Sequence, residues 1–209
     1  YAHGRFLEHT AQELEFCAMS EIFTSNENFL LGSSNDGKEA FAFCSYDSPV
    51  GELLFCSDSK GVAALWFAGR DKSYDDFARN GRFAAGGHNA AAKTWLDEYF
   101  SGHNPGFIPP LSLHGSGFSI KIWEMLLDIQ FGKLTTYGEL ARMYAAKEGL
   151  AHMSAQAIGG AVGRNPVCII IPCHRVVGAG NCLTGYREGL DRKAALLSFE
   201  GIDVSRFSM

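Results

Sequence analysis

The segment 103-HNPGFIPPLSLHGSG-117 constrains the fold most, because it separates two stretches of unlike pattern. It holds three of the six prolines, and proline interrupts both helices and sheets. Before it, apolar residues stand in strand-sized blocks, and after it they recur at helical spacing. The sequence therefore predicts an α+β fold of two domains, 41–112 and 113–209, with residues 1–40 as an extension of unknown role.

Three apolar blocks before this boundary have the length of strands: 41-FAFCSY-46, 52-ELLFCS-57 and 62-VAALWF-67. The connections at 48–51 and 58–61 are short and rich in turn residues. Short turns between apolar runs are typical of an antiparallel meander. We expect the first domain to be built on this small sheet.

Helices are predicted at several places around the sheet and after the boundary. Residues 10–23 have an amphipathic pattern, and 25–39 have the composition of a loop. The apolar spacing predicts further helices over 88–100 and 119–129.

Two short helices follow in the second half. Thr136 and Glu139 form a capping-box pattern that predicts a helix from Tyr137 to residue 147, and Ser154 is placed to cap a helix over 155–164. Two short helices joined by a glycine-containing turn favour a helix-turn-helix, whose second helix enters a DNA groove. Many ordinary helical hairpins share this pattern.

The predicted helix over 155–164 is nearly bare of large side chains and contains the pair Gly159-Gly160. Each glycine lowers helix stability by about 1 kcal/mol relative to alanine, so the pair needs a reason. Tight packing against a neighbouring helix is one explanation. Close approach to a nucleic-acid groove is the other, and both can hold on opposite faces.

The composition limits the class of protein. The 209 residues are 46% hydrophobic and 20% charged, as in soluble globular proteins. No apolar run approaches the roughly 18 residues that a membrane-spanning helix needs, and residues 1–10 lack the apolar core of a secretory signal. Six cysteines are too few for a disulfide scaffold. We expect a protein of the reducing cytoplasm, or of the nucleus if eukaryotic, with no membrane association.

The net charge of −5 hides an uneven distribution. Residues 133–193 carry eight Lys and Arg against four Asp and Glu, whereas the rest of the chain carries ten against nineteen. A basic region on an acidic body is typical of a confined nucleic-acid-binding surface. Chance clustering on a solvated face explains the charge pattern equally well.

The stretch 168-CIIIPCHRVV-177 places two thiols close together. No Cys-x2-Cys pair occurs in the chain, so no metal site is expected. The apolar run predicts a buried strand that ends at Pro172, with Cys168 packed inside it. Cys173 and His174 can then both face a pocket, where the imidazole takes the thiol proton and leaves a nucleophilic thiolate.

The Pro-Cys-His-Arg-Val-Val motif at 172–177, preceded by Asn165-Pro166, resembles the active-site signature of the O6-alkylguanine-DNA alkyltransferases (methylated-DNA–protein-cysteine methyltransferases). Further matching motifs stand in the family's order and spacing at 136–141, 158–161, 183–186 and 193–201. Residues 118–202 resemble the family's C-terminal domain, and the meander resembles its smaller N-terminal domain. The resemblance implies a ribonuclease H-like first domain and a winged-helix-like second domain.

The resemblance implies a specific chemistry. An alkylated guanine is flipped out of duplex DNA, and its alkyl group passes irreversibly to a cysteine of the protein. By resemblance, Cys173 is the acceptor, His174 is its base through a water, and Glu200 orients His174. Tyr137 donates a proton toward the guanine, and Asn165 braces the turn that carries the active site.

The resemblance also implies a guanine pocket and a DNA-contacting surface. The pocket residues are Val176, Tyr186, Arg187 and Lys193. The residues at the DNA are Thr136, Tyr137, Gln156, Ala157, Gly160, Ala161, Arg164 and Arg175. The family inserts its small-residue helix into the minor groove. No cofactor is implied, and the expected partner is double-stranded DNA carrying O6-alkylguanine, bound by a monomer.

Gln156 departs from the family pattern, which often has an arginine that replaces the flipped nucleotide in the base stack. Glutamine can fill part of the gap but lacks the charge and planar stacking of arginine. We therefore expect functional but weaker base flipping. The metal-binding residues of some family members have no counterparts here, since Cys44 and Cys56 are out of register, and no zinc is expected.

Two other functions remain open at this point. A non-catalytic alkyltransferase-like protein that binds DNA damage keeps the fold but lacks the cysteine, whereas Cys173 is present. A thiol hydrolase or redox regulator can use the same Cys-His pair, although no second cysteine stands at CxxC spacing.

Overall fold

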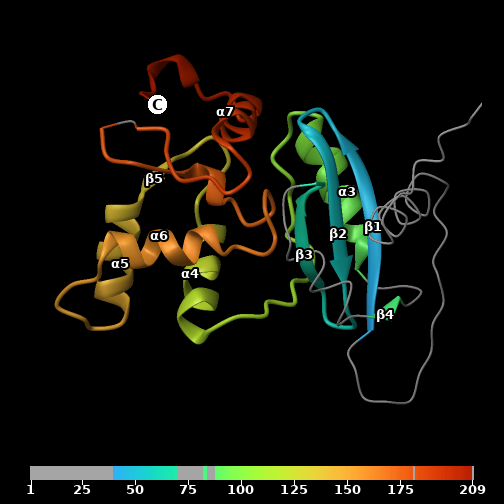
Figure 1. Ribbon diagram of the computed structural model, residues 1–209, viewed down its shortest axis with the longest axis horizontal. Coiled ribbons are helices and arrows are strands. Elements are labelled where there is room, and N and C mark those ends of the chain that lie inside the picture. The colour runs from blue at the N-terminus through green and yellow to red at the C-terminus, as the bar shows by residue number, and fades with distance from the viewer. Residues whose placement is uncertain (1–39, 70–81, 84–87, 181, 209) are drawn as a thin grey trace, which may run out of the picture.

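The computed structural model describes residues 40–69, 82–83, 88–180 and 182–208. The helix predicted over 10–23 and the loop over 25–39 lie outside this part of the chain. The described residues form a mixed α/β structure in which a small sheet lies beside a group of helices (Figure 1).

The sheet has the strand order β3–β2–β1–β4. β1 (Ala40–Ser48), β2 (Gly51–Ser57) and β3 (Val62–Phe67) pair antiparallel, so the predicted meander is confirmed. The two-residue β4 (Arg82–Phe83) runs parallel to β1 and has no recognisable signal in the sequence. β3 is buried along its whole length, which explains why its sequence is apolar throughout and does not alternate.

The first two helices lie close to their predicted positions. α3 (Asn89–Phe100) packs against β1 and β2, and it starts one residue after the predicted helix. α4 (Gly117–Leu127) begins two residues earlier than expected. Ser116 sets this start, because its hydroxyl accepts the Ser119 backbone N–H at 3.2 Å and caps the helix.

The next two helices confirm the local capping signals. α5 (Tyr137–Lys147) starts at the predicted residue, and both hydrogen bonds of the expected capping box are formed. Ser154 caps α6 (Ala155–Gly163) by accepting the Gln156 N–H at 3.2 Å. α6 packs against both α5 and α4.

The remaining elements are short apart from one helix. They are β5 (Thr135–Thr136), the 3-10 helix η1 (Cys173–Arg175), β6 (Val176–Val177), α7 (Leu190–Phe199) and the 3-10 helix η2 (Val204–Arg206). β5 and β6 pair in parallel, which brings the start of α5 next to the end of η1.

The proline-rich segment after α3 stays on the sheet. The Val62 N–H donates to the Pro110 carbonyl at 2.7 Å, and the Ser112 N–H donates to the Val62 carbonyl at 2.9 Å. Farther along β3, Leu65 exchanges backbone hydrogen bonds with residues 166–168. Two later segments of the chain therefore cover the outer edge of β3.

One hydrophobic cluster joins the strand-rich and helix-rich parts. It runs from β2 and β3 through α3 to α4, α5 and α6, and on to the turn that precedes the Cys-His pair. A smaller cluster covers the opposite face of the sheet. The described residues thus share a principal core across the predicted boundary.

The buried strand predicted over 167–171 is wrong. These residues are buried, but the chain folds into a tight turn in which the Ile171 N–H donates to the Val167 carbonyl at 3.0 Å. Ile169 has a φ of 69°, and β-branched residues rarely adopt this left-handed region. Cys168 is packed inside the protein, as expected.

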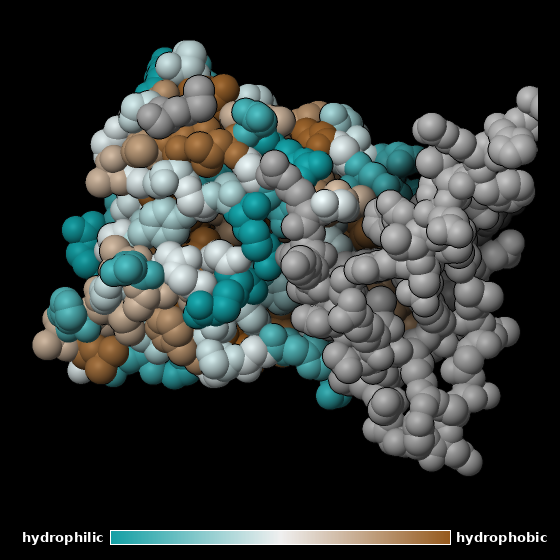
Figure 2. All heavy atoms as spheres, in the orientation of Figure 1, coloured by the Kyte–Doolittle hydropathy of each residue, from teal (hydrophilic) through white to brown (hydrophobic). Residues whose placement is uncertain are grey.

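The surface mixes hydrophilic and hydrophobic residues on the face shown in Figure 2, with a hydrophobic group at the lower left, near the end of α5. Exposed hydrophobic side chains in this part of the chain include Met143, at 52%, and Leu150, at 47%. Within the described ranges, no helix is long and apolar enough to cross a membrane.

Candidate active site

Asn165 holds the tight turn that carries the two cysteines. Its Nδ2 donates to the Ile171 carbonyl at 2.8 Å, and its Oδ1 accepts the Val167 N–H at 3.0 Å. Asn165 is 3% exposed, so these bonds satisfy backbone groups that no solvent reaches. The side chain ties both ends of the turn together and explains how Ile169 is kept at a positive φ.

Cys173 lies where this turn enters η1. Its Sγ accepts a hydrogen bond from Asn165 Nδ2 at 3.0 Å. Burial raises the pKa of the Cys173 thiol, against smaller lowering effects from Asn165 and from the charges of Lys193 and Arg187. The net shift is upward. The residue therefore rests as a thiol and needs a base before it can act as a nucleophile.

His174 forms a buried pair with Glu200. His174 Nε2 lies 2.6 Å from Glu200 Oε1, and both side chains are fully buried. Burial lowers the pKa of His174 more than Glu200 raises it, so the imidazole is neutral at physiological pH. Because Nε2 is engaged by the carboxylate, Nδ1 is the nitrogen that can accept a proton. Nδ1 makes no hydrogen bond to the described residues.

Glu200 is the centre of this network. Its carboxylate accepts hydrogen bonds from Arg175 Nε and Nη2 at 2.9 to 3.1 Å, and from the Gly132 N–H at 3.0 Å. Burial alone would raise the pKa of Glu200, but His174 and Arg175 lower it to about 2. The carboxylate is therefore ionised and fixed in place, as needed to orient an imidazole base.

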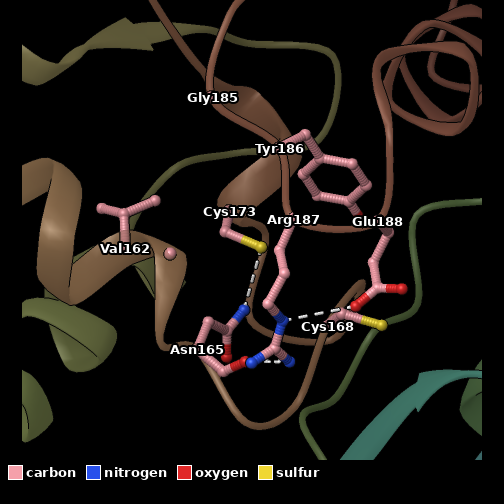
Figure 3. A pocket seen from close by; sticks show the side chains of 9 residues that line it. Val162, Asn165, Cys168, Cys173, Gly185, Tyr186, Arg187 and Glu188 are labelled. Atoms are coloured by element: carbon pink, nitrogen blue, oxygen red, sulfur yellow. Dashed lines mark hydrogen bonds and ion pairs between the residues drawn. The ribbon is translucent and has the colours of Figure 1, made fainter. Parts of the chain in front are cut away.

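A small cavity of about 10 Å³ lies beside Cys173 (Figure 3). It is lined by Val162, Gly163, Asn165, Cys168, Cys173, Gly185, Tyr186, Arg187 and Glu188. The Arg187 guanidinium crosses it, with Nη2 3.3 Å from the Asn165 carbonyl and Nε 3.4 Å from Glu188 Oε1. A space of this size holds about one water molecule. Two predicted pocket residues, Tyr186 and Arg187, thus lie beside the thiol.

The other two predicted pocket residues do not line this cavity. Val176 is fully buried in β6, and Lys193 is fully buried in α7. Lys193 Nζ donates to the carbonyls of Val176 and Thr184, both at 2.6 Å, and burial lowers its pKa to about 8. The Lys193 ammonium therefore links α7 to the backbone at Val176 and Thr184, and its place at the mouth of the guanine pocket stays a prediction.

Tyr137, the first residue of α5, contacts the loop that forms the other wall. Its hydroxyl donates to the Gly185 carbonyl at 2.9 Å. Gly185 has a φ of 66°, and a Cβ there would lie 2.5 Å from the Tyr137 hydroxyl oxygen, so only glycine fits. Burial, with a contribution from Cys173, raises the pKa of Tyr137 to about 12. The phenol keeps its proton and is available as a donor.

The residues predicted to contact DNA fall into two groups. Those exposed along α6 and at its end are Gln156, Ala157, Gly160 and Arg164. Thr136 is half-buried, and its hydroxyl caps α5. Ala161 is fully buried against α4, where the Trp123 indole N–H donates to the Ala161 carbonyl at 2.9 Å. Ala161 thus faces the helix core, and its DNA contact stays a prediction.

Arg175, also predicted to contact DNA, is buried as well. It is 7% exposed, and its guanidinium bonds to Glu200 and to the Ile129 carbonyl. The guanidinium also lies 5.7 Å from the centre of the Phe131 ring. The charge of Arg175 is therefore paired inside the protein.

Sequence reasoning missed two residues of the site. Tyr99 of α3 donates to Glu200 Oε1 at 3.0 Å, across 101 positions of sequence. Glu188 places a carboxylate in the cavity wall and is 2% exposed. Tyr99 has the pattern of an ordinary core aromatic, and Glu188 that of a solvated loop residue. Neither carries a local signal of its contacts.

The sheet cysteines form no shared site. Cys44 pairs with Phe55 and Cys56 pairs with Phe43 across β1 and β2, so the two thiols point to opposite faces of the sheet. In the part of the chain that the structure describes, no three His, Cys, Asp or Glu residues gather as metal ligands.

Comparisons with known proteins agree with this geometry. A family model described as "6-O-methylguanine DNA methyltransferase, DNA binding domain" matches residues 117–202. The chain is 38% identical over 156 residues to the methylated-DNA–protein-cysteine methyltransferase of Mycobacterium leprae, covering 75% of this chain and 90% of that protein. It is 35% identical over 159 residues to the protein of the same name from Methanosarcina acetivorans, covering 75% and 96%.

Solved structures are similar as well. The O6-methylguanine methyltransferase of Mycobacterium tuberculosis matches with a TM-score of 0.64 and 33% identity, over 79% of this chain and 94% of that one. The OGT protein of the same organism, solved in complex with DNA, matches with a TM-score of 0.64 and 34% identity over the same shares. Because it aligns with such relatives over nearly their full length at more than 30% identity, the chain belongs to the methylated-DNA–protein-cysteine methyltransferase family.

Proposed function

We propose that this chain repairs DNA by transferring the alkyl group of O6-alkylguanine irreversibly to Cys173, once per molecule. The observation that carries the proposal is the Cys173 thiol, held by Asn165 at a cavity and followed directly by the buried His174–Glu200 pair. Attack at an alkyl carbon suits a soft thiolate, and this network supplies the base that makes one. Family membership supplies the class of substrate.

The reaction balances with the protein's own groups. Nδ1 of His174 takes the thiol proton, through a water, while Nε2–H stays on Glu200. The Cys173 sulfur attacks the alkyl carbon, and the new C–S bond forms as the bond from carbon to guanine O6 breaks. The electron pair leaves with the guanine, which takes a proton from Tyr137, and the proton held by the His174 imidazolium then restores the Tyr137 phenol through solvent. The products are unmodified guanine and S-alkylcysteine, and no cofactor takes part.

The target carbon is inaccessible inside duplex DNA, so the alkylated base must be extruded. In this proposal α5 and α6 form a helix-turn-helix within a winged-helix-like domain, 113–209. The exposed face of α6 enters the minor groove, and Arg164 attracts phosphate. Residues 41–112 form a ribonuclease H-like domain beside it. The protein acts as a monomer in the cytoplasm, or in the nucleus of a eukaryote.

Gln156 fills the space left by the flipped nucleotide, and it does so less well than arginine. Gln156→Arg is therefore expected to raise both the affinity for DNA and the repair rate severalfold, because a guanidinium stacks and carries charge. DNA affinity and single-turnover rates on the same duplex provide the measurement. If neither changes, residue 156 does not take part in flipping.

Intact mass spectrometry tests the proposed function directly. The protein is incubated with duplex DNA containing O6-methylguanine, and a mass increase of one methyl group is expected. Peptide mapping should place the methyl on Cys173, and Cys173→Ala should gain none. Tight damage-specific binding without a mass change would instead indicate a non-catalytic damage-binding protein. Repeated turnover of a small thiol-reactive substrate would indicate a hydrolase or redox regulator.

A further inference from the structure

Tyr99 brings a phenol from the first half of the chain to the His174–Glu200 pair. Its hydroxyl donates to Glu200 Oε1 at 3.0 Å and lies 3.5 Å from His174 Nε2. Its side chain is fully buried and stacks on Trp95, with ring centres 5.2 Å apart. α3, which carries Tyr99, packs on the sheet and belongs to neither the cysteine turn nor α7.

Tyr99 shares an acceptor with the imidazole. Glu200 Oε1 receives the Nε2–H of His174 at 2.6 Å as well as the phenolic O–H. Burial, followed by the negative charge of Glu200, raises the pKa of Tyr99 far above its usual range, so the phenol remains a donor. Oε1 also accepts from Arg175 Nε at 3.1 Å and Nη2 at 3.0 Å, and a carboxylate oxygen becomes less basic toward each donor as further donors are added.

We infer that Tyr99 is a positioning residue of the alkyl-transfer site. Its hydrogen bond keeps Glu200 Oε1 in position to accept from His174 Nε2. It also weakens the stabilisation that the carboxylate gives to the protonated imidazole. The inference rests on the proposed function, since it assigns Tyr99 to the base that activates Cys173. The first half of the chain then contributes to the chemistry as well as to the core.

The other charged groups around the imidazole come from different elements. Arg175 of η1 donates to the Glu200 carboxylate, and the positive charge of Lys193 in α7 lowers the pKa of His174. Cys173, which carries the thiol, directly precedes His174. The Tyr99 hydroxyl forms its hydrogen bond with Glu200 and not with these groups. Removing that hydroxyl therefore isolates its effect on the pair.

The test is the pH profile of Tyr99→Phe, which keeps the ring and its stacking but removes the donor. Single-turnover methyl transfer is followed by intact mass on duplex DNA containing O6-methylguanine. The acidic limb of the rate profile should move upward by roughly 0.5 to 1 pH unit, because the carboxylate holds the imidazolium more tightly. The imidazole then stays protonated, and unable to take the thiol proton, to a higher pH.

Two variants serve as controls. Tyr144→Phe makes the same change in a buried tyrosine of α5 that packs on Phe118, and its profile should match the wild type. Tyr99→Leu also loses the ring, so it should shift the limb as Tyr99→Phe does and lower the unfolding midpoint further. NMR titration of the His174 ring measures the expected rise in the pKa of His174 directly, independently of methyl transfer.

The inference is overturned if Tyr99→Phe slows the reaction equally at every pH and leaves the His174 titration unmoved. Tyr99 is then a packing residue only. Failure of the proposed function has a different signature, because the wild-type protein itself would gain no methyl group from damaged DNA.

Discussion

At the scale of single residues, burial decides which charges are available for function. Arg175 and His174 both bond to Glu200, and all three side chains lie inside the protein. Buried charges are costly unless they are paired, and here the Arg175 guanidinium pairs with the Glu200 carboxylate. The same pairing keeps Glu200 ionised, while burial keeps His174 neutral, and these are the states that proton transfer from Cys173 requires.

Glu200→Gln tests this pairing through stability. It leaves Arg175 without its buried counter-charge, and we expect a loss of roughly 3–5 kcal/mol in the free energy of unfolding near neutral pH. Folding lowers the pKa of Glu200 from 4.5 to about 2, so its stabilising effect is complete above about pH 4.5 and disappears as the pH falls toward 2. Denaturant unfolding at several pH values should show the two proteins converging over this window.

A matched control is Glu148→Gln, which removes the charge from a surface pair with Lys121. Surface pairs contribute about 0–1 kcal/mol, so little change is expected. A difference between Glu200→Gln and wild type that stays constant with pH would contradict the assignment.

Arg187 lines the small cavity beside the Cys173 thiol. An alkylated base needs far more space than about 10 Å³, so a lining group must move when the base enters. Arg187 is the clearest candidate, because its side chain is 37% exposed whereas those of Asn165 and Cys173 are buried. Arg187→Ala should increase the rate with free O6-benzylguanine severalfold relative to free O6-methylguanine. Free bases are used so that contacts with DNA do not affect the rates. If Arg187→Ala left the ratio of the two rates unchanged, Arg187 would not control access to the thiol.

At the scale of elements, the structures that sequence predicted best are those with local signals. The capping box at Thr136 and the cap at Ser154 each involve residues within three positions, and both helices start where expected. The apolar residues at 167–171 predict a strand, whereas the turn that they form depends on hydrogen bonds from Asn165 that the apolar pattern does not indicate. The partners of Glu200 lie 25 and more positions away, so burial of Arg175 and the part played by Tyr99 could not be predicted.

The small residues of α6 can now be weighed against the two explanations for them. A Cβ on Gly159 would lie 3.6 Å from the Tyr137 ring, and one on Gly160 would meet only the Arg164 side chain at 3.4 Å. These are ordinary or nearly ordinary contacts, so packing inside the protein does not require either glycine. The geometry favours close approach to DNA on the exposed face.

Gly160→Ala separates folding from binding on this helix. Alanine should raise the free energy of unfolding by up to about 1 kcal/mol, because it favours the helix. Its methyl group should at the same time weaken DNA binding severalfold, by holding α6 away from the groove. Gly117→Ala on α4, where a Cβ meets nothing within 4 Å, should stabilise without affecting DNA affinity. Stabilisation with unchanged affinity in Gly160→Ala would place the DNA elsewhere.

At the scale of the whole molecule, the principal core crosses the boundary that composition indicates. Residues of the sheet, α3 and the helices of the second half belong to one cluster. Elements that share a core of this kind are expected to unfold in one transition. Tryptophans on both sides of the boundary, Trp95 and Trp123, allow this to be followed by fluorescence.

At Gly61 the proline-rich segment lies close against the sheet. A Cβ there would lie 2.4 Å from the Pro110 carbonyl oxygen, so Gly61→Ala must push the proline-rich segment off β3. Overpacking of this kind lowers the free energy of unfolding by about 1–3 kcal/mol. We expect Gly61→Ala to unfold in a single transition that all spectroscopic probes report at the same midpoint. Gly106→Ala is the control in the same segment, since its Cβ meets nothing within 4 Å. Two separate transitions would show that the halves unfold independently.

The covered edge of β3 has a consequence for how these molecules behave at high concentration. An open strand edge presents unpaired N–H and C=O groups that a second chain can extend into a longer sheet. At this edge, the backbone N–H and C=O groups of Val62 and Leu65 already form hydrogen bonds with the segments at 110–112 and 166–168. The contacts that fasten the cysteine turn to the sheet thereby also protect this edge against aggregation, and loosening them would expose a site for strand addition.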